Sequence, residues 1–84
     1  MGAASMGTQR RRTLQRIFST VLDRPDVGPD ENFFDLGGNS VMAMAVVERV
    51  RAELGGKVNA RTFYKWPTIA GIDENVVFGG DDHG

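Results

Sequence analysis

Residues 33–41 read Phe33-Phe34-Asp35-Leu36-Gly37-Gly38-Asn39-Ser40-Val41, an apolar segment that runs through two glycines into the start of a helix. The glycines permit a sharp turn and the close approach of another molecule to the backbone. Ser40 then stands at the first helical position, where unpaired N–H groups and the positive end of the helix dipole favour a phosphate group. The local pattern leaves two interpretations open. Ser40 receives a phosphate ester, or Ser40 or Asn39 is only the N-cap of the helix.

The residues that follow predict a helix from about Ser40 to Leu54, ended by the glycine pair Gly55-Gly56. At about 100° per residue, one face of this helix carries the apolar residues expected in the core. These residues are Ala43, Val46, Val47, Val50 and Leu54. Val41, Met44 and Ala45 lie on the opposite face, which is normally polar in a small domain. The helix therefore has an apolar surplus outside the core at its N-terminal end.

An amphipathic helix is predicted at about residues 9–22, and Pro25 keeps it from extending much further. Its apolar stripe at i, i+3, i+4, i+7 and i+8 consists of Leu14, Ile17, Phe18, Val21 and Leu22. The long connection at residues 23–39 has room for a single helical turn at residues 30–34. Its apolar residues predict an ordered loop that packs over the helices, because disorder would leave them in water. They are Val27, Phe33, Phe34 and Leu36.

Two further helices are predicted near the C-terminus. A short one is expected at about Ala60–Lys65, with Asn59 as its N-cap. A last helix begins after Thr68, and Ile69, Ile72 and Val76 recur on one of its faces. The pattern contains no credible sheet. The predicted fold is an all-α bundle of four helices, three long and one short, with a long ordered loop between the first two.

With 84 residues, the chain has room for one small domain. We expect this domain at residues 8–77, between a flexible tail or cloning remnant at residues 1–7 and a flexible tail at residues 78–84. The net charge of −1 argues against binding to a nucleic acid duplex. The basic run Arg10-Arg11-Arg12 is expected to be a solvated helix start or tail. No apolar run is long enough to cross a membrane, so we expect a cytoplasmic protein.

Ser40 lacks the setting of a catalytic nucleophile. The run Gly38-Asn39-Ser40-Val41-Met42 begins like the G-x-S-x-G elbow but ends in Met42, where the second glycine belongs. A serine nucleophile also needs a neighbouring base, and the single histidine, His83, lies in the glycine-flanked C-terminal tail. The chain has no cysteine, which excludes a disulfide framework and a thiolate metal site. Ser40 therefore has the character of a residue that another enzyme modifies.

The run from Asp30 to Ser40, together with Val41-Met42-Ala43-Met44, resembles the phosphopantetheine attachment site of carrier proteins. Residues 49–55 and 63–72 match the same family, so the resemblance covers roughly residues 9–75. The double glycine is more similar to the peptidyl carrier (thiolation) domains of nonribosomal peptide synthetases than to fatty-acid carriers. Asn39 stands where aspartate or histidine is common, and Val41 where leucine is common. These two departures leave the choice between a peptidyl and an acyl carrier open.

The resemblance implies that Ser40 bears a covalent 4′-phosphopantetheine arm taken from coenzyme A, with Gly38 and Asn39 as flanking residues. It also implies that Val41, Met44 and Phe63 contact partner enzymes. The domain is expected to hold aminoacyl or acyl groups as thioesters in nonribosomal peptide or related polyketide biosynthesis, without catalysing a reaction itself.

The expected partners are a phosphopantetheinyl transferase that uses Mg²⁺, an adenylation or acyltransferase enzyme, and condensation, ketosynthase, tailoring or thioesterase enzymes. We expect a monomer that binds neither nucleic acid nor a membrane. The alternative is a small helical adaptor that binds other proteins without being modified, and a miniature hydrolase is a more distant third. Measuring the intact mass after exposure to a transferase separates the first two.

Overall fold

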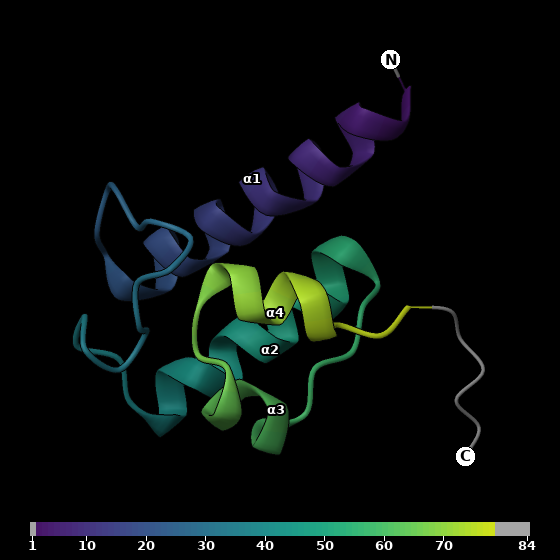
Figure 1. The fold of residues 1–84 in the computed structure, drawn as a ribbon. Coiled ribbons are helices and arrows are strands. Elements are labelled where there is room, and N and C mark those ends of the chain that lie inside the picture. Colours follow the sequence, from purple (N-terminus) through teal and green to yellow (C-terminus); the bar gives the residue numbers. More distant parts are fainter. Residues whose placement is uncertain (1, 79–84) are drawn as a thin grey trace.

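The computed structural model describes residues 2–78. Four helices follow one another in the chain: α1 (Gly2–Leu22), α2 (Ser40–Leu54), α3 (Ala60–Lys65) and α4 (Ile69–Asn75). α1 packs against α2 and α4, and α3 packs against the same two helices from below in the view of Figure 1. The part of the chain described contains no strand, only an isolated antiparallel bridge between Lys57 and Val77. The predicted all-α class is confirmed.

Short polar residues and glycine set the ends of the helices. The Asn59 side chain accepts a hydrogen bond from the Thr62 N–H at the start of α3, and Thr68 caps α4 in the same way. Gly55 ends α2 in the left-handed conformation with φ 70°, which glycine adopts without steric cost. The bounds predicted for α2 and α3 are confirmed, because both helices have strong local caps.

Three boundaries differ from those predicted. α1 begins at Gly2, so residues 2–7, expected as a tail, are helical; periodicity detects only the part of a helix that packs on a core. α4 has only seven residues, so the bundle has two long and two short helices. The helix stops at Asn75 because the backbone that follows is extended and Val77 pairs with Lys57. The turn expected at residues 30–34 lies at residues 33–37. His83 and the rest of the expected C-terminal tail beyond Phe78 lie outside the described residues.

The core draws apolar residues from all four helices and from the long loop. Phe33 of the loop is fully buried and packs edge-to-face against both Phe18 of α1 and Phe63 of α3. The other buried hydrophobic residues are Leu14, Ile17, Leu22, Val27, Ala43, Val46, Val50, Val58, Ile69 and Ile72. The predicted core face of α2 is confirmed, with Val47 and Leu54 packed at its edge.

Hydrogen bonds hold the long loop against the helices. The Phe33 N–H donates to the Pro67 carbonyl at 2.7 Å, and the Ala70 N–H of α4 donates to the Pro29 carbonyl at 2.9 Å. The Gln15 side chain of α1 donates to the Val27 carbonyl at 3.2 Å. The prediction of an ordered loop that packs on the bundle is therefore confirmed.

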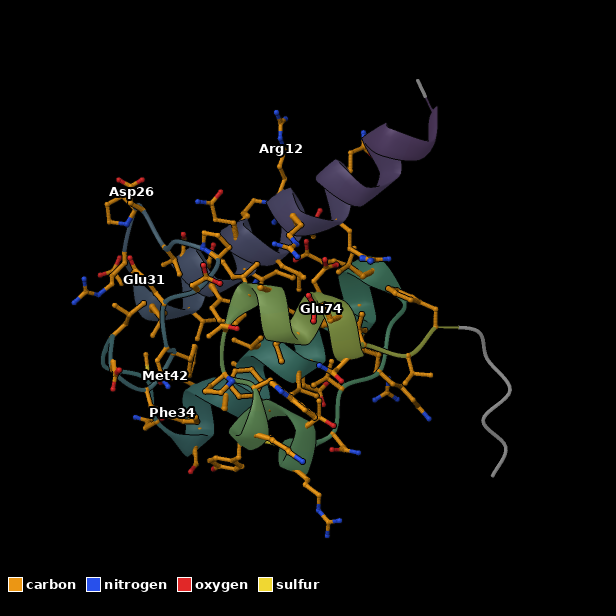
Figure 2. All side chains as sticks on the ribbon, in the orientation of Figure 1. Arg12, Asp26, Glu31, Phe34, Met42 and Glu74 are labelled. Atoms are coloured by element: carbon orange, nitrogen blue, oxygen red, sulfur yellow. The ribbon has the colours of Figure 1, made fainter. Side chains whose placement is uncertain are left out.

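The basic run of α1 is only partly solvated. Arg10 and Arg11 both donate to the carboxylate of Asp73 in α4, at 2.5 and 2.6 Å, whereas Arg12 points away from the bundle (Figure 2). The expected solvated helix start therefore describes Arg12 best, because Asp73, 63 and 62 residues further along the chain, pairs with Arg10 and Arg11. Among residues 2–78, no helix combines the length and apolar character required to cross a membrane.

Candidate functional site

Ser40 is the first residue of α2 and is exposed to solvent. Asn39 caps the helix: its side-chain oxygen accepts a hydrogen bond from the Met42 N–H at 2.9 Å, and its carbonyl accepts one from the Ala43 N–H at 2.8 Å. Of the two residues considered as the N-cap, Asn39 takes the role. The hydroxyl of Ser40 is not used for capping and is available at the surface.

The two glycines before the site are required for different reasons. Gly37 has φ 101°, a conformation that other residues rarely adopt. Gly38 has no such constraint on φ, but a Cβ atom there would lie 2.3 Å from the ring of Phe33. One glycine therefore allows the turn, and the other allows the loop to pack closely against its own buried phenylalanine.

The side chain of Tyr64 reaches Ser40 from α3. The Tyr64 hydroxyl lies 2.6 Å from the Ser40 hydroxyl, a hydrogen bond in which either oxygen can donate. The ring of Tyr64 stacks on the ring of Phe34, with centroids 5.3 Å apart and planes 2° from parallel. Sequence reasoning missed this contact because the two residues are 24 positions apart and share no local pattern.

The residues expected to contact partners have very different exposures. Val41 is 79% exposed and Met44 is 41% exposed, so the apolar surplus predicted at the start of α2 lies on the surface. Phe63 is completely buried in the aromatic core and cannot be a surface contact. The exposed aromatic residues of this region are Tyr64 and Trp66. A helix of six residues is too short for periodicity to indicate which of its aromatic side chains faces inward.

Phe34 and Met42 are two partly buried residues near the site. Both are partly buried and pack against the core, and Figure 2 shows them at the same end of the molecule, beside the first turn of α2. Phe34 contacts Phe33 and Phe63 edge-to-face on its inner side and Tyr64 on its outer side. The surface around Ser40 is thus supported by side chains that reach directly into the core.

Comparison with known proteins identifies both a matching family and related proteins. A family model described as a phosphopantetheine attachment site matches residues 12–72. The chain is 38% identical over 72 residues to a dimodular nonribosomal peptide synthase of Bacillus subtilis strain 168. It is also 38% identical over 74 residues to surfactin synthase subunit 3 of the same organism. These matches cover 86% and 88% of the chain but only 3% and 6% of the two relatives.

Solved structures of similar size share the fold. BlmI, a type-II acyl carrier protein from Streptomyces verticillus involved in bleomycin biosynthesis, superposes with a TM-score of 0.78 at 30% identity, covering 87% of this chain and 88% of BlmI. A chain from the complex of the phosphopantetheine transferase Sfp with coenzyme A and a peptidyl carrier protein gives a TM-score of 0.74 at 30% identity. That match covers 76% of this chain and 83% of the other.

The four-helix fold and the exposed serine at the start of α2 define a carrier domain. The chain belongs to the phosphopantetheine attachment family, as a domain of the peptidyl carrier type. Members of this class hold intermediates on a 4′-phosphopantetheine arm. The residues around Ser40 fit such a group, because Ser40 is exposed and Asn39, not Ser40, caps the helix.

Proposed function

We propose that Ser40 is the attachment residue of the 4′-phosphopantetheine arm, and that the domain carries aminoacyl or acyl groups as thioesters in nonribosomal peptide or related polyketide synthesis. One observation carries this proposal: Ser40 presents an exposed hydroxyl at the first residue of α2, while Asn39 caps that helix. The complex of a transferase, coenzyme A and a peptidyl carrier protein among similar structures supports coenzyme A as the donor.

The attachment reaction transfers one group from coenzyme A. The Ser40 Oγ forms a bond to the phosphorus nearer the pantetheine, the pyrophosphate bond breaks, and adenosine bisphosphate leaves. The hydroxyl proton passes to a base of the transferase, which also holds the Mg²⁺. The attached arm ends in a thiol, and a chain without cysteine needs such an imported thiol to carry a thioester.

The remaining chemistry belongs to the partners. We assign the cargo loading to an adenylation or acyltransferase enzyme, and later steps to condensation, ketosynthase, tailoring or thioesterase enzymes. Val41 and Met44 offer these partners an apolar contact beside Ser40. In this assignment residues 8–77 act as a monomeric, non-catalytic carrier domain, with Gly38 and Asn39 flanking the modified serine.

Incubation with coenzyme A, Mg²⁺ and a broad-specificity phosphopantetheinyl transferase tests the proposal by intact mass. We expect a gain of one phosphopantetheinyl group, followed by a second gain when the modified protein is offered an activated amino or acyl group by its loading enzyme. A chain that stays unmodified would instead be a helical adaptor. A modified chain that accepts no cargo from any tested enzyme would restrict the proposal to attachment alone.

A further inference from the structure

The hydroxyl of Tyr64 is placed to act on whatever is attached to Ser40. The two oxygens are 2.6 Å apart, although the residues come from different helices. We propose that Tyr64 is a binding residue for the phosphate of the arm: its hydroxyl hydrogen-bonds Ser40 before modification and the phosphodiester after it. This inference rests on the proposed attachment at Ser40.

Modification changes which of the two oxygens can donate. A free Ser40 hydroxyl either donates or accepts, whereas an esterified Ser40 Oγ has no hydrogen and can only accept. Tyr64 then remains as the donor of the pair. The non-ester oxygens of the phosphate lie one atom beyond Ser40 Oγ and carry the negative charge, so they are better acceptors than the ester oxygen. A charge-assisted hydrogen bond is roughly twice as strong as a neutral one. The Tyr64 hydroxyl therefore favours the modified form.

The position of the Tyr64 hydroxyl does not depend on its bond to Ser40 alone. Its ring lies parallel to the ring of Phe34, which in turn contacts the buried rings of Phe33 and Phe63. The side chain is nevertheless half exposed, so its hydroxyl can turn toward a group that extends from Ser40 into solvent. The ring is held by stacking, and only the O–H bond of the hydroxyl needs to rotate.

Two consequences follow for the carrier. Before modification, the Ser40 hydroxyl is hydrogen-bonded to Tyr64, and this hydrogen bond has to break when Ser40 attacks coenzyme A. After modification, the same hydroxyl keeps the root of the arm next to α3 while the rest of the arm stays free to move. Tyr64 thus binds the phosphate of the arm and takes no part in the chemistry of the thioester.

The test compares the unmodified and modified forms of the wild type and of Y64F. This substitution keeps the ring that stacks on Phe34 and removes only the hydroxyl. We expect modification to raise the melting temperature of the wild type more than that of Y64F, because only the wild type exchanges a neutral hydrogen bond to Ser40 for a charge-assisted one that is roughly twice as strong. The difference between the two increments should be about 4–8 °C in a domain of this length. The phosphorus NMR resonance of the folded modified form should also differ between the two proteins, and the two resonances should coincide in urea.

W66F serves as the matched control, because Trp66 is an exposed aromatic residue directly after the same helix, and its ring lies under the ammonium group of Lys65. Its melting increment should equal that of the wild type. Equal increments in wild type and Y64F, with coincident phosphorus resonances in the folded proteins, would overturn the role of Tyr64. Absence of any mass gain in the wild type would instead overturn the attachment at Ser40, so the two failures are distinguishable.

Discussion

The ring of Phe33 lies so close to Gly38 that a Cβ atom on Gly38 would fall 2.3 Å from its Cε2 carbon and 2.4 Å from its Cδ2 carbon. The Gly38 N–H also donates to the Phe33 carbonyl at 3.1 Å. Because Phe33 is fully buried among Phe18 and Phe63, the backbone two residues before Ser40 is fitted directly onto the hydrophobic core. Packing of the core and presentation of the attachment residue are therefore coupled.

Replacing Gly38 tests this coupling. G38A forces either the ring or the loop to move, and we expect it to lower the free energy of unfolding by about 1–3 kcal/mol, the usual cost of an overpacked core. Urea unfolding followed by circular dichroism measures the change. G28A is the control, because a Cβ atom there meets Glu31 only at an ordinary 3.5 Å, and its stability should stay close to wild type. A G38A midpoint equal to that of the wild type would show that the ring does not fill this space.

Much of the fold could be predicted from the sequence wherever the determinants are local. The glycine pair after Leu54 sets the end of α2, and Asn59 sets the start of α3. Each of these signals acts within a few residues. The burial of Phe33 follows from the cost of leaving an apolar side chain of an ordered loop in water.

The features that sequence reasoning missed depend on contacts between distant segments. Asp73 faces Arg10 and Arg11 only after α4 has packed on α1. The hydrogen bond between Ser40 and Tyr64 forms only when α3 lies beside the start of α2. The inward position of Phe63 is also decided by this packing. Local periodicity carries no information on how helices pair, which is why the serine was identified but its tyrosine partner was not.

The apolar surplus at the start of α2 makes a prediction about partner binding. Met44 is 41% exposed, so M44E should place its charge in solvent, and we expect helical circular dichroism and melting temperature close to wild type. The charge should weaken docking, lowering the rate of modification or of cargo transfer by about tenfold, the loss typical of an interface residue worth slightly more than 1 kcal/mol. Initial rates followed by intact mass measure this effect.

A52E is the matched control for M44E, since Ala52 is an exposed alanine further along the same helix. It should retain wild-type rates. Wild-type rates in both variants would show that the docking surface does not include Met44. Loss of the cooperative thermal transition in M44E alone would show that Met44 supports the fold instead.

The Asp73 carboxylate predicts a dependence of stability on pH. Burial raises the pKa of Asp73, but hydrogen bonds from Arg11 and Arg10 outweigh it, so the pKa lies below its ordinary value of 3.8. A group whose pKa is lower in the folded than in the unfolded chain stabilises the fold while it is ionised. Its contribution is therefore present above about pH 4 and is lost as the pH falls through the folded-state pKa.

D73N removes this contribution while keeping the shape of the side chain. Both guanidinium groups are more than a third exposed, so solvent screens the pair, and we expect a loss of about 1 kcal/mol at neutral pH. Urea unfolding of wild type and D73N between pH 7 and acid conditions should show the two stabilities converging as the pH drops. A constant difference across that range would mean that the pair is held by packing rather than by charge.

Ser40 alone is expected to accept the phosphopantetheinyl group. The most direct measurement is the intact mass of wild type, S40A and S19A after incubation with coenzyme A, Mg²⁺ and a broad-specificity transferase, with peptide sequencing to locate the added group. Ser19 is a partly buried serine of α1 and serves as the control for loss of a hydroxyl elsewhere. We predict one added group in wild type and S19A, located on Ser40, and none in a folded S40A. An added group on folded S40A, or its location on any other residue of the wild type, would contradict the assignment.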